Sequence, residues 1–280
     1  FPTQLDLRGL RLVVDCAHGA AYNVAPHVFH ELGADVVSIG VDPDGLNIND
    51  KIGATTPSTL RQQVLEKKAD LGIGLDGDAD RVVIVDGRGS LYDGDQLLYA
   101  IAKHRAAKGK VSGVAGTLMT NLAFENAMQR LGIPFGRAAV GDRYVLEMMR
   151  EKGWELGGEN SGHVICLDKP PTGDGLVSAL QVLHALRETQ ASLAELTAEL
   201  VMYPQVLVNV KVPRGFDWRK HSAIGKAQAE AERALNGRGR VLLRPSGTEP
   251  VLRVMVEGEP RAAIESAAKS IADAVKQAAS

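Results

Sequence analysis

The sequence predicts an α/β protein with two tandem β/α domains, whose sheets are mixed and mostly parallel, followed by a small α+β C-terminal domain with two helices on an antiparallel sheet. Apolar strand-like runs alternate with helical patterns up to Tyr203-Pro204, and beyond it the order changes to strand, helix, strand, strand, helix. The composition, 45% hydrophobic and 24% charged, is typical of a globular protein. We therefore expect domains at residues 1–88, 89–202 and 203–280.

The first domain is predicted from short apolar runs separated by helical segments. Thr56 is a good N-cap residue, and Pro57 suits a first helical turn. Gly72, Gly74 and Gly77 spell a dinucleotide-binding pattern, but the first two lie within a strand-like run, so we expect no such site. The predicted elements are a strand at Leu12 to Asp15, a helix at Ala21 to Leu32, a strand at Asp35 to Ile39, a helix from Thr56-Pro57 to Lys67, and strands at Leu71 to Leu75 and Val82 to Val85.

The second domain repeats this rhythm after the turn at Gly87-Arg88-Gly89, which suggests two similar domains in tandem. Its predicted helices are Asp93 to Ala107, Asn121 to Leu131, Asp142 to Lys152, a helix that opens at Thr172 to Gly175 and runs to Arg187, and Leu193 to Leu200. Its predicted strands are Val111 to Gly116, Phe135 to Val140, Trp154 to Leu156 and His163 to Leu167.

The third domain has the pattern of two helices packed on an antiparallel sheet. Its predicted strands are Val206 to Val212, Val241 to Leu243 and Leu252 to Val256, and its predicted helices are Trp218 to Leu235 and Ala262 to Ala279.

The bulk properties exclude several classes of protein. The net charge of −2 argues against nucleic-acid binding, and no apolar run reaches the roughly 20 residues of a membrane span. Cys16 and Cys166 are far apart in apolar surroundings, so we expect reduced core cysteines, no secretion signal and a cytoplasmic location. The chain begins at Phe1 and runs quickly into a strand, so we expect it to be part of a longer polypeptide.

The most informative segment is Asp76-Gly77-Asp78-Ala79-Asp80-Arg81, which lies between two apolar runs. In a loop, this spacing lets the carboxylates of Asp76, Asp78 and Asp80 converge on one hard cation such as Mg²⁺. Arg81 adds a planar guanidinium that fits phosphate oxygens. We therefore predict a magnesium site beside a phosphate.

This segment has two alternative interpretations. An acidic surface turn is the simpler one, but the flanking apolar runs favour a loop that joins buried strands. An EF-hand fits poorly, because Arg81 stands where that loop needs Gly and Gly87 where it needs Glu.

A second polar loop, Arg244 to Pro250, joins two apolar strands of the third domain. A tight turn of this kind directs successive backbone N–H groups inward as an anion nest. Its predicted phosphate ligands are Arg244, Ser246, Gly247 and Thr248, with Arg253 on the following strand. A hairpin that merely carries polar residues is the alternative.

A third polar loop, Gly157 to His163, links two short strands of the second domain. Glu159 and Ser161 have the groups needed to bind vicinal sugar hydroxyls, and His163 is a candidate proton shuttle because imidazole titrates near neutrality. Arg143 begins a helix after a strand, where an anion can bind. The alternatives are a solvated carboxylate for Glu159 and a structural ion-pair partner for Arg143.

The remaining histidines are predicted to be surface residues. His27 and His30 are three residues apart on a helix, but no third metal ligand is evident in the sequence. The same interpretation applies to His18, His104, His184 and His221.

The three loops together, DGDADR, GENSGH and RPSGTEP, resemble those of the α-D-phosphohexomutases and occur in the same order. The resemblance covers essentially the whole chain. Three further stretches are similar to a bacterial subgroup that interconverts glucosamine 6-phosphate and glucosamine 1-phosphate: Leu46 to Asn49 with Gly53 to Thr55, Gly116 to Met119, and Val140 to Val145.

The resemblance implies a reaction in which a phosphoserine gives its phosphoryl group to a phosphosugar, forming a bisphosphate that reorients and returns its other phosphate. It implies Mg²⁺ on Asp76, Asp78 and Asp80, charge neutralisation by Arg81, sugar contacts from Glu159 and Ser161, and a phosphate clamp around Arg244. The whole enzyme would be an isomerase and a phosphoprotein of amino-sugar metabolism, supplying a peptidoglycan precursor.

The family has four domains, and this chain resembles the last three. The family's serine loop, T/S-A-S-H-N-P, does not occur in the 280 residues. We therefore expect the missing N-terminal domain to be a partner and this chain alone to be inactive. The sequence leaves open a homodimer, a phosphomannomutase/phosphoglucomutase specificity, a non-catalytic sugar-phosphate-binding homologue and a metal-dependent phosphatase.

Overall fold

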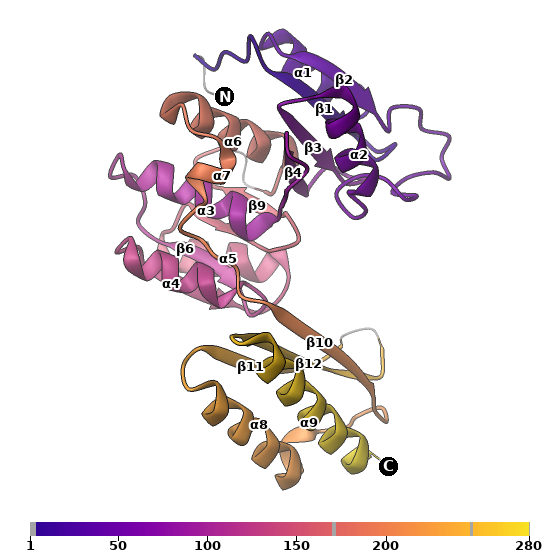
Figure 1. Ribbon diagram of the computed structural model, residues 1–280, viewed down its shortest axis with the longest axis vertical. Helices are drawn as coiled ribbons and strands as arrows, with labels where there is room; N and C mark the ends of the chain where they lie inside the picture. The colour runs from indigo at the N-terminus through magenta and orange to yellow at the C-terminus, as the bar shows by residue number, and fades with distance from the viewer. Residues whose placement is uncertain (1–3, 170–171, 247–248, 280) are drawn as a thin grey trace. The chain divides into compact units, whose positions relative to one another are not determined.

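A computed structural model describes residues 4–169, 172–246 and 249–279 of the chain (Figure 1). Its internal contacts divide the chain into two compact units. Unit 1 contains residues 1–120 and 124–200, and unit 2 contains residues 121–123 and 201–280. The predicted fold class is confirmed, since two mostly parallel sheets lie in unit 1 and an antiparallel sheet lies in unit 2.

The first sheet of unit 1 has five strands in the order β2-β1-β3-β4-β5. Strands β2, β1 and β3 are parallel, whereas β4 is antiparallel to β3 and β5 is antiparallel to β4. The short strand β5 was not predicted from the sequence. The bounds are β1 Arg11–Asp15, β2 Asp35–Ile39, β3 Leu71–Leu75, β4 Val82–Asp86 and β5 Leu91–Tyr92.

Helices α1 (Val24–Glu31) and α2 (Ser58–Lys67) accompany this sheet. The predicted N-cap at Thr56 is wrong: Pro57 occupies that position and makes no side-chain cap, because Thr56 belongs to a preceding turn in which its N–H binds Gly53. The close approach of α2 explains why β3 carries glycine rather than a larger residue at Gly72. A Cβ there would lie 2.5 Å from Val64 of α2, so the missing side chain lets the helix approach the sheet.

The second sheet of unit 1 has the order β7-β6-β8-β9, with only β9 antiparallel to its neighbour. Its strands are β6 Val114–Thr117, β7 Phe135–Ala138, β8 Leu156–Gly158 and β9 Val164–Cys166. The strand predicted at Trp154 to Leu156 was placed too early: the N–H of Trp154 still bonds to Met149 of the preceding helix, and its ring packs in the core around Met149.

The helices of this part are α3 Gly94–Ala106, α4 Leu122–Arg130, α5 Asp142–Lys152, α6 Gly175–Thr189 and α7 Leu193–Leu196. Helix α3 begins with a capping box, in which Asp93 accepts from the Gln96 N–H while the Gln96 side chain accepts from the Asp93 N–H. The Asp174 side chain caps α6 in the same position. Helices α3 and α6 pack against each other.

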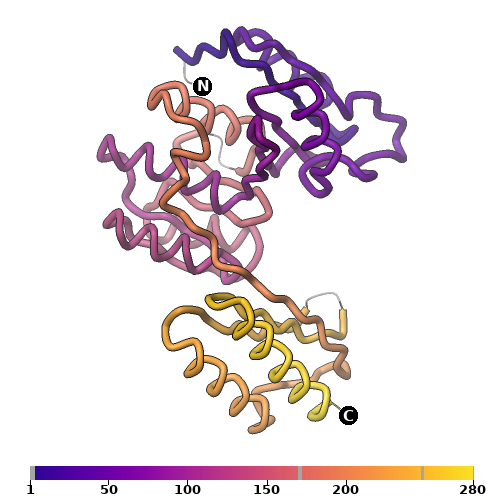
Figure 2. The backbone as a smooth tube through the Cα atoms, in the orientation of Figure 1, coloured from indigo at the N-terminus to yellow at the C-terminus, as the bar shows by residue number. Residues whose placement is uncertain are grey.

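Unit 2 has a three-stranded antiparallel sheet in the order β10-β12-β11. Its elements are β10 Gln205–Lys211, the 3₁₀ turn η1 Trp218–Lys220, α8 Ser222–Leu235, β11 Gly239–Pro245, β12 Val251–Gly258 and α9 Arg261–Ala279. Figures 1 and 2 show α8 and α9 side by side, and both contribute to the core with the sheet.

The single helix predicted from Trp218 to Leu235 is wrong. Asp217 caps the short η1 turn, and His221 then adopts an extended conformation before α8 begins at Ser222. The His221 ring stacks on Phe216 with 4.8 Å between centroids, which provides a packing reason for the break.

Candidate functional site

The segment Asp76 to Arg81 forms a tight turn at the end of the buried strand β3. The N–H of Ala79 bonds to the Asp76 carbonyl at 3.0 Å, and Ala79 has a positive φ of 59°, which is uncommon for a residue with a side chain. Strain of this kind concentrates at functional loops. The neighbouring chain segments hold the turn, since the Ala20 N–H bonds to the Gly77 carbonyl at 2.8 Å.

The turn brings the three predicted metal ligands together. One carboxylate oxygen from each of Asp76, Asp78 and Asp80 lies within 4.8 Å of the others. Asp76 is only 1% exposed, whereas Asp78 is exposed and Asp80 is half-buried. A buried carboxylate at the base and an exposed one at the rim form a set of oxygen ligands that is open to solvent on one side.

The charge in this turn is only partly balanced by the protein. Burial raises the pKa of Asp76, and the carboxylates of Asp80 and Asp78 raise it further, while the backbone N–H and the charge of Arg81 lower it. Arg81 Nε lies 2.7 Å from Asp76 Oδ2 and 3.4 Å from Asp80 Oδ1. The contact with Asp76 Oδ2 is not aligned as a hydrogen bond, and that buried oxygen has no hydrogen-bond donor among the described residues.

This donor set fits a hard divalent cation. Mg²⁺ prefers oxygen ligands, and it would supply the positive charge that Asp76 Oδ2 receives, within the described part of the chain, from an unaligned guanidinium alone. In this structure Arg81 is turned toward two carboxylates rather than toward open space.

His163 lies directly against the acidic turn. Its Nδ1 is 3.0 Å from Asp80 Oδ2, and the residue is only 5% exposed. The imidazole therefore orients one of the candidate metal ligands. This contact joins a histidine of the second sheet's loop to a carboxylate of the first sheet's loop.

Backbone hydrogen bonds fix these two loops to each other. The Val82 N–H, directly after the acidic turn, bonds to the Gly162 carbonyl at 3.1 Å, and the Gly94 N–H ties the start of α3 to the same loop through the Asn160 carbonyl at 3.2 Å. Gly162 has a φ of 99°, and a Cβ there would lie 2.3 Å from the Val82 carbonyl oxygen. Only glycine therefore fits this contact.

Glu159 and Ser161, the predicted sugar ligands, lie on this same loop. Glu159 is half-buried and its Oε1 accepts a hydrogen bond from the Gly141 N–H at 2.9 Å, while Ser161 is exposed. Arg143 lies at the start of α5, and its predicted role in anion binding stays a prediction. Its side chain is 79% exposed and pairs with Glu147 one turn along the helix at 2.8 Å.

In unit 2, Arg244 and Arg253 are directly paired across β11 and β12, so their side chains project from the same face of the sheet. Like charges in this arrangement repel, and the Nε of Arg253 is buried with no hydrogen-bond partner among the described residues. The nearest acidic contact of Arg253 is Glu249 at 4.0 Å. Two guanidinium groups on one face of a sheet are a candidate site for an anion.

Ser246 follows β11 at the start of the predicted phosphate loop, where its N–H bonds to the Val251 carbonyl at 2.9 Å. Gly247 and Thr248, the other predicted ligands, lie outside the described residues. An open cavity of about 390 Å³ borders Ser246, and its lining includes Arg214. Sequence reasoning missed Arg214 because it belongs to a separate segment between β10 and η1.

Several predictions about single residues are settled by burial. Cys16 and Cys166 are buried free thiols, as expected, and His27 and His30 are exposed. The prediction that His104 is a surface residue is wrong, since it is 8% exposed and bonded to Glu188.

Among the described residues, no helix combines the length and apolar character needed to span a membrane.

The fold and this site define a class of protein: a multidomain α/β protein whose acidic turn presents oxygen ligands suited to a hard divalent cation. The chain belongs to the phosphoglucomutase/phosphomannomutase family. Models of that family's alpha/beta/alpha domain II, alpha/beta/alpha domain III and C-terminal domain match residues 3–89, 93–203 and 207–274 in turn. The predicted resemblance to the phosphohexomutases is thereby confirmed.

Curated relatives are similar over nearly the whole chain. A phosphoglucosamine mutase of Azoarcus sp. (strain BH72) is 63% identical over 278 residues, which are 99% of this chain and 62% of that protein. One from Dechloromonas aromatica (strain RCB) is 64% identical over 279 residues, with 100% of this chain and 62% of that protein covered. The chain thus spans about three fifths of the length of these relatives.

Solved structures share the fold at lower sequence identity. A phosphoglucomutase/phosphomannomutase family protein of Burkholderia thailandensis has a TM-score of 0.80 and 23% identity, covering 98% of this chain and 62% of that one. N-acetylphosphoglucosamine mutase of Aspergillus fumigatus, in complex with GlcNAc-6P and magnesium, has a TM-score of 0.75 and 22% identity, covering 99% and 63%.

Proposed function

We propose that this chain is the metal-binding and sugar-binding part of a phosphohexomutase that interconverts glucosamine 6-phosphate and glucosamine 1-phosphate. One structural observation carries the phosphoryl-transfer chemistry: three carboxylates converge within 4.8 Å beside the loop that holds His163. The choice of sugar rests on the 63% and 64% identity to relatives named phosphoglucosamine mutase.

Asp76, Asp78 and Asp80 would hold Mg²⁺. The bound ion would supply positive charge to the phosphoryl oxygens during transfer. Their own arrangement supports this role, because three carboxylates at the end of one strand repel one another unless a cation lies among them.

Arg81 and His163 would act beside the ion. With the carboxylates neutralised by a cation, the half-exposed guanidinium of Arg81 is free to turn toward a phosphate oxygen. His163 contacts Asp80 through Nδ1, so it would hold that ligand in place, and its role as a proton shuttle stays a prediction from the sequence.

Substrate binding would fall to two loops. Glu159 and Ser161, on the loop bonded to the acidic turn, have the groups to bind sugar hydroxyls, and Arg143 would approach only after leaving Glu147. On the other loop, Arg244, Arg253, Ser246, Gly247 and Thr248 would bind the phosphate that does not react. The facing pair Arg244 and Arg253 is the main support for this assignment.

The phosphoryl donor would be a serine outside these 280 residues, on an N-terminal domain of the same polypeptide. The chain would then comprise three domains, at residues 1–88, 89–202 and 203–280, and would not turn over alone. The whole protein would work in the cytoplasm, as an enzyme that cycles through a phosphoserine and a sugar bisphosphate.

The test is a coupled mutase assay on the full-length parent protein, encoded by this sequence together with its upstream reading frame. We expect kcat/KM for glucosamine 6-phosphate to exceed that for glucose 6-phosphate and mannose 6-phosphate, and we expect activity to require Mg²⁺. A preference for mannose or glucose phosphate would assign the chain to the other specificity of the family. An upstream frame that encodes no serine loop would overturn the mutase proposal.

A further inference from the structure

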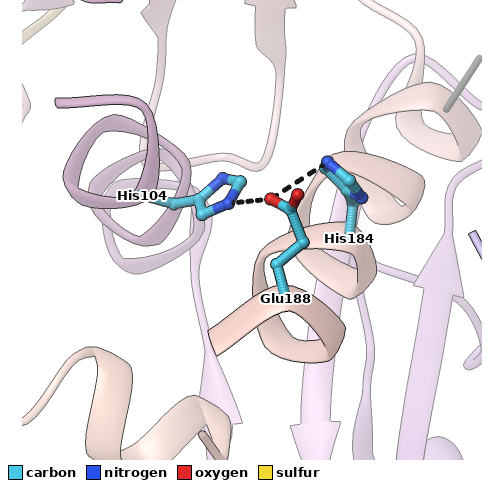
Figure 3. A group of neighbouring side chains, drawn as sticks. All are labelled: His104, His184 and Glu188. Carbon is cyan, nitrogen blue, oxygen red and sulfur yellow. Dashed lines mark hydrogen bonds and ion pairs between the residues drawn. The ribbon is translucent and has the colours of Figure 1, made fainter. Parts of the chain in front are cut away.

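A second group of side chains that can bind a metal lies in unit 1. It is distant from the acidic turn in the sequence, and its ligand atoms are of a different type. His104 comes from α3, and His184 and Glu188 come from one face of α6, four residues apart (Figure 3). Glu188 Oε2 is 2.6 Å from His104 Nε2 and 3.3 Å from His184 Nε2. Two packed helices therefore direct two imidazoles at one carboxylate.

The geometry of this cluster suits a small coordination sphere. One ligand atom from each residue lies within 4.8 Å of the others, and the two rings meet edge to face with 5.5 Å between centroids. Two imidazole nitrogens with one carboxylate oxygen are a common three-ligand set for Zn²⁺, in which a fourth position stays open. Mg²⁺ prefers an all-oxygen set, so the two clusters differ in the ion they favour.

We propose that His104, His184 and Glu188 bind a divalent transition-metal ion, best matched by Zn²⁺, and that the bound ion joins α3 to α6. The rigidity of the ligands supports this. His104 is only 8% exposed and lies on a largely buried helix, so its nitrogen is held in place before an ion arrives. Such preorganisation lowers the cost of binding.

The protonation states of the ligands are also suitable. Burial lowers the pKa of His104 and of His184, which favours the neutral imidazole that binds metals. The ammonium of Lys108 is the main cause that lowers the pKa of Glu188 to about 2, so its carboxylate is ionised at neutral pH.

Lys108 is the competitor for this site, since its Nζ contacts the same oxygen of Glu188. Its side chain is 39% exposed, and an exposed ion pair contributes little, so an incoming metal ion can replace it. Arg105 is not a competitor, because it is bound to Asp168 and Gln181.

The open position of the metal would face a polar surrounding. Both histidines line an open cavity of about 160 Å³. Its charged walls include Arg105, Lys108, Lys110 and Lys169 on the basic side and Glu155 and Asp168 on the acidic side. The excess of basic groups favours water, hydroxide or a small anion as the fourth ligand.

Co²⁺ is the probe, because a tetrahedral site gives it intense visible absorption bands whereas an octahedral site gives weak ones. We expect the 280-residue chain to develop these bands with one equivalent of Co²⁺, and Zn²⁺ to abolish them. His184→Gln and Glu188→Gln should each weaken binding at least about tenfold. The double variant His27→Gln/His30→Gln, which removes two exposed histidines of α1, is the matched control and should bind like the wild type.

Lys108→Met separates a metal site from a plain salt-bridge network. If a metal binds here, removing the competing ammonium should tighten Co²⁺ binding severalfold, whereas a network without a metal function would only lose an ion pair. Asp78→Ala should leave the bands unchanged, which distinguishes this site from the acidic turn. The proposal is overturned if both ligand variants bind Co²⁺ like the wild type, if the α1 control loses the bands, or if Lys108→Met fails to tighten binding.

Discussion

The acidic turn of unit 1 brings negative charges together, and the arginine pair of unit 2 brings positive charges together. In the turn, Asp76, Asp78 and Asp80 converge, and Arg81 balances them only in part. In the pair, Arg244 faces Arg253 across two strands, and the nearest carboxylate to Arg253 is Glu249, at 4.0 Å. Each arrangement brings like charges together, and we propose a ligand of opposite charge for each, a cation for the turn and an anion for the pair.

The two regions differ in what holds them. The acidic turn is fixed by distant segments, through hydrogen bonds from Ala20 to Gly77 and from Val82 to Gly162. The arginine pair is positioned by the register of β11 and β12, and β12 is also paired with β10, where Asn209 lies opposite Arg253. The position of the candidate metal ligands therefore depends on contacts between loops, whereas the position of the arginines depends on the strand pairing of one sheet.

The largest expected effect comes from removing a charge from the acidic turn. Asp78→Ala should lower kcat/KM of the full-length protein by about 10²–10³-fold, the range seen when a group that stabilises transition-state charge is lost. Asp78 is exposed, so the fold should persist. A coupled assay with circular dichroism measures both. Asp273→Ala, which removes an aspartate on α9, is the control, and equal loss in the two variants would contradict the role of the turn.

The next effect tests whether the turn depends on its neighbouring loop. Gly162→Ala should destabilise the chain by about 2–4 kcal/mol, because its Cβ would meet the Val82 carbonyl oxygen at 2.3 Å and the residue has a positive φ. Urea unfolding measures this change. Gly132→Ala is the matched control, with a φ of 68° and open space around the added Cβ. If both variants lose the same free energy of unfolding, the contact with Val82 does not add to the cost of the substitution.

A smaller effect is expected in the arginine pair. Arg244→Ala should weaken binding of the sugar phosphate by about 1.5–3 kcal/mol, the scale of a hydrogen bond to a charged group. The measurement is KM and kcat in the full-length protein, compared with Arg219→Ala, whose side chain is 70% exposed. Unchanged KM in the Arg244 variant would remove this residue from the proposed phosphate site.

The smallest effect concerns pH. Because the pKa of Asp76 is raised in the folded protein, its ionised form opposes folding above that raised pKa, and this penalty disappears as the pH falls below the unfolded value of about 4. In metal-free buffer, Asp76→Asn should therefore stabilise the chain at pH 7 by about 1 kcal/mol or less, and the gain should shrink toward pH 4. Thermal unfolding across this range measures it, and saturating Mg²⁺ should reverse its sign at pH 7.

Sequence reasoning placed the regular elements better than the contacts between them. Strands such as Leu71–Leu75 and helices such as Asp142–Lys152 match the structure because apolar periodicity encodes them directly. The break at His221 and the early turn at Thr56 were missed, since stacking and local backbone bonds overrode helix propensity there. The two-residue strand Leu91–Tyr92 is too short to show a period.

The candidate site was likewise predicted in part. The spacing of the three aspartates shows which side chains can converge, because they belong to one short loop. The contact of His163 with Asp80 and the cluster of His104 with Glu188 join residues more than eighty positions apart, and only the packing of separate elements brings them together. The identity of a single residue does not indicate which distant residue it will contact.

Three backbone bonds give the proposed reaction a mechanical constraint. Val82 bonds to Gly162, Gly94 to Asn160, and the Gly175 N–H to the Ala79 carbonyl at 2.8 Å, so backbone bonds tie the acidic turn, the loop from Gly157 to His163 and the starts of α3 and α6 to one another. In the proposed reaction a hexose would present first one end and then the other to the same ion, and separating these elements would break all three bonds. We therefore expect the sugar to turn over while these elements stay in place, guided by the parts of the protein outside them.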